Sequence, residues 1–457
     1  MRHAKSVEPA WLGLTRTEWL LAVTVLLLVG IFVHPYRAQQ ASRYTLTAAI
    51  VEQRTVVLDD YSHVLGRDRA IREDHIYSDK APGQPFMAVP FFAVGKAIGV
   101  EDATVLRVNA NLGLWWITFW SAALPGAALA VMMYRRTSSL RCRGSLLATW
   151  STFAGTLLLP FSALLFGHVL AAALLYGAFM FLSGRPGFWS LVGSGALAGL
   201  AVGVEYTAAL GVAVLAVYSV WRHRMLAMAW LAGGLPAALA LAAYNKVAFG
   251  DPLTLSYQYS AFHEVASTSR SVFFMFSSAT LENLTRLLMD GRGLLVATPI
   301  VIVAVVAAIS TSLKRGKQDD VVMAIAMFAI YLMVPILWGN PWGGASPGPR
   351  YMSLALPFLV VPVAQAWVRW PRFTAFTAGV SVLTMSSATV TEPLLRRDTA
   401  DGLNTWLQRL LNGEAAPTLL TLTAGELGWL VHIVIIVSAL MLLVRSHKRR
   451  LLTAECL

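Results

Sequence analysis

Residues 17–34 read TEWLLAVTVLLLVGIFVH, a long apolar stretch near the start of the chain. A helix needs about 20 mostly apolar residues to cross the hydrocarbon core of a bilayer. No small-residue cleavage site follows this stretch, so it does not have the pattern of a cleaved signal peptide. We therefore interpret Thr17 to His34 as a first membrane span.

Eleven further segments have the same apolar character. They lie at 108–134, 144–162, 164–182, 188–204, 206–221, 225–244, 293–312, 321–338, 351–368, 373–391 and 427–444. The chain of 457 residues is 57% hydrophobic and only 13% charged, whereas soluble domains are about 25% charged. Too few charges remain to cover a water-facing surface. The predicted fold class is an all-α polytopic membrane protein of about 12 transmembrane helices, forming a single integral membrane domain over residues 1–457. The regions 144–182 and 188–221 are expected to be tight helical hairpins.

The loops between these spans differ in charge. The set that includes both termini carries 19 Lys and Arg against 5 Asp and Glu, and the other set carries 17 against 19. Cytoplasmic loops of membrane proteins carry an excess of Lys and Arg, so the first set and both termini are predicted to be cytoplasmic. The net charge of +12 is therefore explained by topology in the cytoplasmic (inner) membrane, with membrane lipids as partners, and nucleic acid is not expected.

Three long loops are predicted on the extracytoplasmic side, at 35–107, 245–292 and 392–426. Loops longer than about 12–15 residues are usually functional. Within the first loop, Ser42 to Glu52 is expected to form a short amphipathic helix at the membrane interface. Phe86 to Ile98, after the turn at Pro82-Gly83, is expected to form a short interfacial or re-entrant helix.

Two pairs of charged residues in the first loop are candidates for chemistry. Asp59 and Asp60 follow an apolar run, and adjacent carboxylates resist ionising together, which raises the pKa of one toward the range of a general base. Asp79 and Lys80 precede the Pro82-Gly83 turn, where a cation at headgroup depth is well placed for a lipid phosphate. The alternative for any single acid here is a solvated charge paired with a neighbouring base.

The order of these motifs resembles the first outer loop of the C-type glycosyltransferases (GT-C). The motif Ser42-Arg43-Tyr44, an acid-bearing stretch, Asp79-Lys80-Ala81-Pro82-Gly83 and a short apolar helix is most similar to the branch of lipid A aminoarabinose transferases and protein O-mannosyltransferases. The resemblance implies an enzyme that takes a sugar from a polyprenyl-phosphate carrier and passes it to a glycan, lipid or protein acceptor outside the cytoplasmic membrane. It also implies an acidic base in this loop and a contact between Lys80 and the carrier phosphate.

The sequence departs from this branch just before Arg43. Where the aminoarabinose branch has acids, this chain has Gln40, Ala41 and Ser42. The usual position of the base is therefore empty. Asp60 or Asp59 is expected to take that role, with Asp79 as a third choice.

Further candidate substrate-binding residues lie near the predicted outer ends of spans. They are His168, which could orient a carboxylate or phosphate; Glu205, a carboxylate beside a membrane segment; Tyr244 and Tyr257, whose rings suit sugar stacking; and Arg350 and Arg292, which could hold phosphate in bidentate fashion together with Lys80. Arg350 ends a Gly/Pro-rich segment, 340–351, that could approach a ligand closely. Each aromatic residue could instead be an interfacial anchor, and Arg350 a snorkelling side chain.

The sequence contains no metal-ligand spacing of His and Cys, no phosphate-binding P-loop and no nucleophile elbow. Its two cysteines, Cys142 and Cys456, allow neither a disulfide framework nor a cysteine metal site. Asp59 and Asp60 could hold a divalent cation, and no other cofactor is expected. One alternative function is a transporter or flippase of a lipid-linked cell-envelope precursor, which predicts ionisable residues deep within spans. A non-catalytic membrane scaffold is another.

Overall fold

The computed structural model describes residues 13–100, 111–142, 144–261, 281–313, 318–337, 341–396, 399 and 401–455. Several predicted features fall wholly or partly outside these residues. They include Cys456, the basic loop at 314–317, residues 108–110 and 338 of two predicted spans, the first residue of the 340–351 segment, and positions 101–107, 262–280, 397, 398 and 400 of the three long loops.

Helices occupy every segment predicted to cross the membrane, which confirms the all-α polytopic fold class. These helices are α1 (Arg16–Val29), α4 (Leu112–Thr118) continuing through the π-helical turn η2 (Phe119–Ala123) into α5 (Leu124–Ser139), α6 (Ser145–Ala154), α7 (Leu158–Ser162), α8 (Gly167–Leu182), α9 (Phe188–Val204), α10 (Ala208–His223), α11 (Ala227–Phe249), α14 (Pro299–Ser312), α15 (Asp319–Leu337), α16 (Val360–Arg369), α17 (Pro371–Val390) and α20 (Leu427–Glu455). Among the described residues, five helical stretches are long and apolar enough to cross a membrane by length and composition. The number of spans stays a prediction.

The remaining elements are short and connect or cap these helices. They are α2 (Ala38–Glu52), η1 (Asp59–Tyr61), β1 (Ala70–Arg72), β2 (His75–Tyr77), α3 (Gly83–Ala97), η3 (Arg224–Leu226), η4 (Ser256–Tyr259), α13 (Leu281–Met289), η5 (Arg350–Leu354), η6 (Leu356–Leu359), α18 (Gly402–Leu411) and α19 (Leu419–Ala424).

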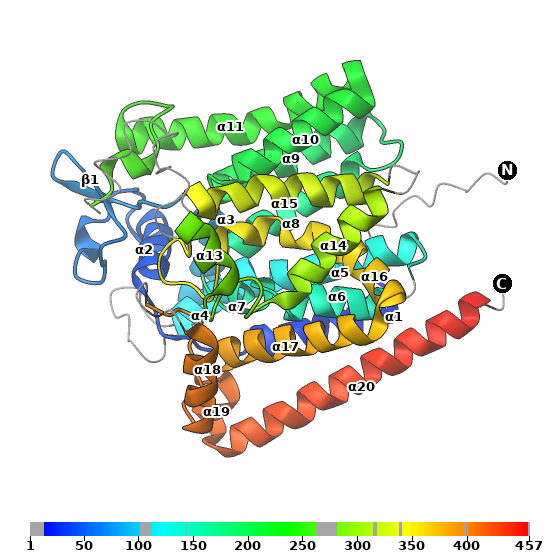
Figure 1. The fold of residues 1–457 in the computed structure, drawn as a ribbon. Coiled ribbons are helices and arrows are strands. Elements are labelled where there is room, and N and C mark those ends of the chain that lie inside the picture. Colours follow the sequence, from blue (N-terminus) through cyan, green and yellow to red (C-terminus); the bar gives the residue numbers. More distant parts are fainter. Residues whose placement is uncertain are drawn as a thin grey trace.

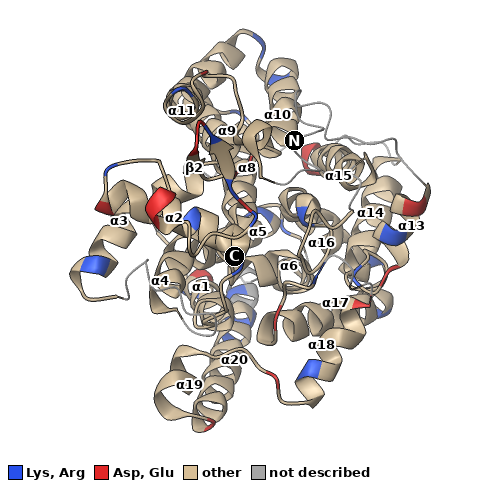
Figure 2. Cartoon of the chain, turned by 90° about the vertical axis from the view of Figure 1, so that its left-hand side faces the viewer, with Lys and Arg blue, Asp and Glu red and all other residues tan. Residues whose placement is uncertain are grey.

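The elements of the long loops gather at one end of the helix bundle, which we call the loop end (Figure 1). The hairpin β1–β2 and helices α2, α3, α18 and α19 lie there. The start of α1 and the end of α20 lie at the opposite end, the terminal end, where the hydroxyl oxygens of Thr17 and Ser446 are 2.9 Å apart. Viewed from the loop end, acidic and basic residues are intermixed (Figure 2), as the near-neutral charge of these loops in the sequence requires.

Helix α2 confirms the helix predicted near Ser42 to Glu52, but its burial differs from the prediction. Every residue from Gln39 to Ala49 is buried, so the helix has no exposed face in its middle. Residues of α3, α4 and α11 pack around it, among them Phe92, Leu114 and Phe249. The amphipathic interpretation was wrong because a pattern of small and polar residues can also be enclosed on all sides. Helix α3, by contrast, exposes apolar side chains as an interfacial helix does.

The hairpin β1–β2 was not predicted from the sequence. Ala70 pairs with Tyr77 and Arg72 with His75, and the two turn residues, Glu73 and Asp74, have φ angles of 51° and 66°. Two successive left-handed residues form the turn type that suits a tight hairpin, although Gly and Asn are the usual residues there. Strand β2 leads directly into residues 78–80, which lie on the side of the loop end that faces the helix bundle.

Gly83 anchors the turn after Lys80 to the end of α9. A Cβ atom at Gly83 would lie only 2.5 Å from the carbonyl carbon of Gly203 and 2.7 Å from the amide nitrogen of Val204. Only glycine allows this close approach of two backbones. The first loop is thereby held against the helix end that carries Glu205.

We expect Gly83→Ala to destabilise the protein by roughly 1–3 kcal/mol, because the added methyl group must displace backbone. Gly203→Ala is the matched control, since a Cβ there would meet nothing within 4 Å. The measurement is thermal unfolding of the detergent-solubilised protein. Equal unfolding temperatures for the two variants would show that this contact does not hold the loop.

Candidate functional site

Six ionisable side chains meet beneath the loop end. They are Arg43 from α2, Asp68, Asp79 and Lys80 from the first loop, Glu205 at the end of α9, and Arg350 at the start of η5. The exposed fractions of Arg43, Asp79, Glu205 and Lys80 are 1%, 2%, 4% and 6%. Such residues are almost never buried unless they are paired. The cluster contains as many carboxylates as cations, so it is close to neutral as a whole.

One part of the cluster, which we call the acidic half, consists of Lys80 between Asp68 and Asp79. The Lys80 ammonium donates to a carboxylate oxygen of each aspartate at 2.8 Å. Two hydroxyl groups support this arrangement. Ser42 donates to Asp79 Oδ1 at 3.4 Å, and Ser256 donates to the backbone carbonyl of Asp79 at 2.9 Å.

The two aspartates of the acidic half differ in their affinity for protons. Burial raises the pKa of Asp79 above its usual range, and the attraction of Lys80 only partly offsets this. Desolvation also acts to raise the pKa of Asp68, but Lys80 outweighs it and holds that pKa below its usual range. Burial alone would lower the pKa of Lys80, yet the two carboxylates raise it. Asp79 is thus the carboxylate better suited to accept a proton.

The other part, which we call the basic half, consists of Arg43, Glu205 and Arg350. Arg43 Nη2 is 3.4 Å from Glu205 Oε2, a long contact. Arg350 donates to Gln39 Oε1 at 3.1 Å and to the Tyr351 hydroxyl at 3.4 Å. Both arginines also interact electrostatically with Glu205 and with Tyr257.

Several predicted site residues therefore lie together. Asp79, Lys80, Glu205 and Arg350 are members of the cluster, and His168 Nδ1 lies 3.5 Å from Glu205 Oε2. Two tyrosines lie at the edge of this region. Tyr257 packs edge-to-face on Tyr206 at 5.5 Å, and Tyr244 packs against Phe86 and Phe249 at 5.7 and 6.2 Å.

Asp59 and Asp60 do not join this cluster. Asp59 accepts hydrogen bonds from His75 and from the amide of Ile76, both at 2.7 Å, and its side chain is 40% exposed. Asp60 is exposed and accepts a hydrogen bond from Gln53 at 2.9 Å. Among the contacts of the described residues, neither aspartate reaches Lys80 or Arg350, so the predicted convergence of these four residues is not observed.

The expected rise in pKa is also wrong for Asp59. Partial desolvation acts to raise the pKa of this carboxyl, but the hydrogen bonds from His75 and Ile76 outweigh it and place the pKa below its usual range. The physical reason is that the hairpin brings an imidazole and a backbone amide to Asp59. These partners stabilise its ionised form.

Arg292 is buried among the backbone of two other segments of the chain. Its guanidinium donates to the backbone carbonyls of Ser346 and Arg396, each at 3.1 Å, and lies 4.8 Å from the ring centre of Trp342. Arg292 therefore braces the Gly/Pro-rich segment that leads to Arg350. Its role as a phosphate ligand stays a prediction.

Metal binding has no further support from the geometry. Within the part of the chain that the structure describes, no group of three or more His, Cys, Asp or Glu side chains could hold a metal ion. A divalent cation at Asp59 and Asp60 stays a prediction.

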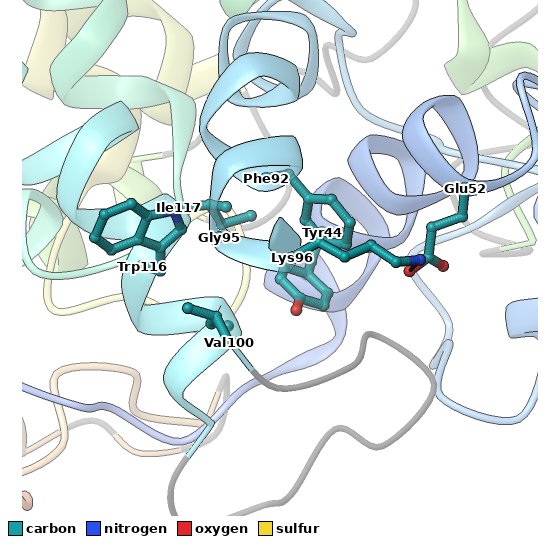
Figure 3. A pocket seen from close by; sticks show the side chains of 9 residues that line it. Tyr44, Glu52, Phe92, Gly95, Lys96, Val100, Trp116 and Ile117 are labelled. Atoms are coloured by element: carbon teal, nitrogen blue, oxygen red, sulfur yellow. Dashed lines mark hydrogen bonds and ion pairs between the residues drawn. The ribbon is translucent and has the colours of Figure 1, made fainter. Parts of the chain in front are cut away.

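Two hollows open beside α3 at the loop end. The smaller, of about 80 Å³, is lined by Tyr44, Glu52, Phe92, Lys96 and Trp116 among others (Figure 3). Its charged groups are already paired, because Lys96 Nζ donates to Glu52 at 2.8 Å. The larger hollow, of about 500 Å³, is mostly apolar and is lined by Ile50, Arg54, Thr55, Val56, Val57, Tyr77, Phe86 and Val247. Tyr77, which lines this hollow, is followed directly in the chain by residues 78–80, and Asp79 and Lys80 belong to the cluster.

Comparison with known proteins supports the fold. No protein-family model matches this chain, and neither does any curated protein sequence. Among solved structures, the chain is similar to the crystal structure of ArnT from Cupriavidus metallidurans bound to undecaprenyl phosphate. The TM-score is 0.55 at 13% sequence identity, over 94% of this chain and 75% of that chain. The chain therefore shares the polytopic membrane fold of that protein.

Two members of the cluster were missed by the sequence predictions. Asp68 stands between Arg67 and Arg69, so it resembled a solvated charge. Arg43 is part of the Ser42-Arg43-Tyr44 motif, but the sequence prediction placed this motif in an interfacial helix. One signal could have identified Arg43, because it is the only charged residue between positions 38 and 51. A single charge in such a helix indicates a buried ion pair.

The acidic half predicts unequal effects of two charge-removing variants. We expect Lys80→Gln to destabilise the protein by roughly 3–5 kcal/mol, because it leaves two carboxylates facing each other in a buried site. Adding Asp68→Asn should restore much of this loss. The exposed control, Asp59→Asn with Asp60→Asn, should change the free energy of unfolding by less than about 1 kcal/mol. Denaturant or thermal unfolding measures all three, and a Lys80→Gln protein as stable as the control would contradict the buried pairing.

Proposed function

We propose that this protein is a membrane glycosyltransferase that moves a sugar from a polyprenyl-phosphate carrier to an acceptor hydroxyl. The observation that carries the proposal is the cluster of Arg43, Lys80 and Arg350 with three carboxylates at the loop end, in which four of the six residues are buried and two are partly buried. The fold similarity to ArnT, a protein solved with undecaprenyl phosphate bound, supports the lipid phosphate as ligand.

The cluster contains the groups that such a reaction needs. In the proposed step, the acceptor oxygen forms a bond to the anomeric carbon, and the bond between that carbon and the carrier phosphate oxygen breaks. The electron pair stays on the phosphate, whose charge the buried cations stabilise. The acceptor proton passes to a carboxylate, and Asp79 is the candidate general base. The reaction requires no nucleotide.

The larger hollow supports an apolar substrate. It lies between the end of α2, the start of α3 and the end of α11, and it borders the strand that leads to Asp79. A lipid tail placed there would keep its head near the cluster. This arrangement is part of the proposal and applies to a lipid donor or a lipid acceptor.

We propose that the loop end faces the extracytoplasmic side of the cytoplasmic membrane, with both chain termini in the cytoplasm. In the sequence, the loops that accompany the two termini are the basic ones, and described acids near the terminal end pair with arginines. Arg135 contacts Glu18 at 2.8 Å, and Arg136 contacts Asp320 at 2.7 Å. These pairs lie in or next to the first or last turns of helices, a placement that favours an enzyme over a transporter with charges deep in its spans.

Sugar transfer can be tested directly with the purified protein. We expect release of polyprenyl phosphate from at least one member of a panel of polyprenyl-phosphate sugars when mixed glycan, lipid and peptide acceptors are present. Asp79→Asn should lower that rate by about 100-fold or more, because it removes the proton acceptor. The double variant of Asp59→Asn and Asp60→Asn should retain transfer. No release from any donor would refute the proposed function, and full activity of Asp79→Asn would refute its base.

The pH dependence of transfer gives a separate test. Since the base must be ionised, the rate should fall as the pH drops through the pKa of Asp79, which lies above the ordinary aspartate value of about 4. Lys80 lowers that pKa by its charge, so any residual activity of Lys80→Gln should fall off at a higher pH than in the wild type. An acidic limb at or below pH 4, or one unmoved in Lys80→Gln, would contradict the assignment.

A further inference from the structure

We propose that Arg43 and Arg350 form the anion-binding subsite of this cluster, and that Lys80 is a positioning residue that holds Asp79. The ligand is a phosphate monoester or diester at the head of a lipid. This assignment rests on the proposed function and divides the roles within the same site.

The first argument is the charge around Lys80. An ammonium group has three N–H donors, and Asp68 and Asp79 already take two of them at 2.8 Å. With two carboxylates and one ammonium, the acidic half has an excess of negative charge. A phosphate brought to Lys80 would meet two like charges in a buried site, which is unfavourable.

The basic half has the opposite excess. Arg43 pairs with Glu205 at 3.4 Å, and the same carboxylate attracts Arg350 from a greater distance. The hydrogen bonds that Arg350 donates to described residues go to neutral groups, the amide oxygen of Gln39 and the hydroxyl of Tyr351. One additional negative charge would therefore balance this half. A lipid phosphate supplies such a charge.

Arg43 and Arg350 also have donors to offer. Arg43 Nε and Nη1 and Arg350 Nε are buried and have no hydrogen-bond partner within the described part of the chain. Buried donors are nearly always satisfied in native proteins, so a group of them in one place indicates a ligand or ordered water. The planar fork of arginine matches phosphate oxygens in pairs, which a lysine cannot do.

The surroundings of Arg43 favour an anion as well. A Cβ at Gly167 would lie 3.2 Å from Arg43 Nη1, so this nitrogen lies at the N-terminus of α8. The N-terminus of a helix carries a partial positive charge and unpaired amides. Glycine at this position lets the start of α8 approach the guanidinium and the end of α9 closely.

This division separates the two products of the transfer step. The leaving phosphate gains its charge in the basic half, and the proton arrives at Asp79 in the acidic half. The two halves remain close enough to interact, because Arg43 lowers the pKa of both aspartates. The role of Lys80 is then to fix the orientation of Asp79.

The test compares two charge-matched double variants, each of which removes one cation and its adjacent acid. They are R43Q with E205Q and K80Q with D68N, and the exposed Arg67→Gln serves as a control. Full-length protein in lipid nanodiscs is titrated with undecaprenyl phosphate and with undecaprenol, which has the same tail and no charge. Native mass spectrometry measures both affinities, and far-UV circular dichroism confirms folding. Charge-matched pairs are used because a single substitution would leave a buried charge unpaired.

We expect R43Q with E205Q to weaken binding of the phosphate at least about tenfold and to leave binding of the alcohol unchanged. K80Q with D68N should bind the phosphate within about threefold of the wild type, as should Arg67→Gln. Loss of phosphate binding in K80Q with D68N, or wild-type binding in R43Q with E205Q, would overturn this assignment and leave the proposed function intact. Equal binding of phosphate and alcohol by the wild type would instead remove the lipid-phosphate donor itself.

Discussion

The position of Lys80 between Asp68 and Asp79 is the constraint on which the rest of the site depends. Burying an isolated charge is very costly, so these three groups can be buried only together and in one geometry. The hairpin β1–β2 and the close contact at Gly83 fix the two sides of this segment. The hydroxyls of Ser42 and Ser256 then bind Asp79 from two other elements. A flexible first loop could not hold these three side chains in one geometry.

The helix bundle supplies the other half of the site from its ends. Glu205 caps α9, His168 stands in the first turn of α8, and Arg350 begins η5. Polar residues are tolerated at helix ends, where backbone groups lack partners within the helix. Arg292 supports this arrangement indirectly, because it binds the backbone of the segment that precedes Arg350. An apolar bundle thus holds a polar site at one end without placing charges in its middle.

The helical bundle could be predicted from the sequence because long apolar segments have a strong physical signature. The site was only partly predictable. Lys80, Asp79, Glu205 and Arg350 were identified as candidates, since charges beside apolar helices are costly. The prediction of a raised pKa for Asp59 was wrong, because the adjacency of two acids in the sequence does not reveal which groups will bind them in the fold. The hairpin that brings His75 to Asp59 turns on Glu73 and Asp74, and these residues are not typical of such turns.

The first and third long loops are also joined to each other, and this helps to explain how a site can be built from distant segments. Glu392 pairs with Arg37 before α2 and with Arg409 of α18, the latter at 3.1 Å, and its carbonyl accepts from Trp406 at 3.0 Å. The first and third loops therefore share one carboxylate. Arg350, which binds Gln39 of α2, ties the segment after α15 to the same helix.

The low sequence identity to ArnT is compatible with this architecture. Lipid-facing helices require only apolar character, so many sequences satisfy the same fold, whereas a buried charge must keep its partner. Arg43 has no acid beside it at positions 40–42, and Glu205 pairs with it from a different helix. The chemistry of this chain therefore follows from how its own charges are paired, and the fold determines only where that pairing occurs.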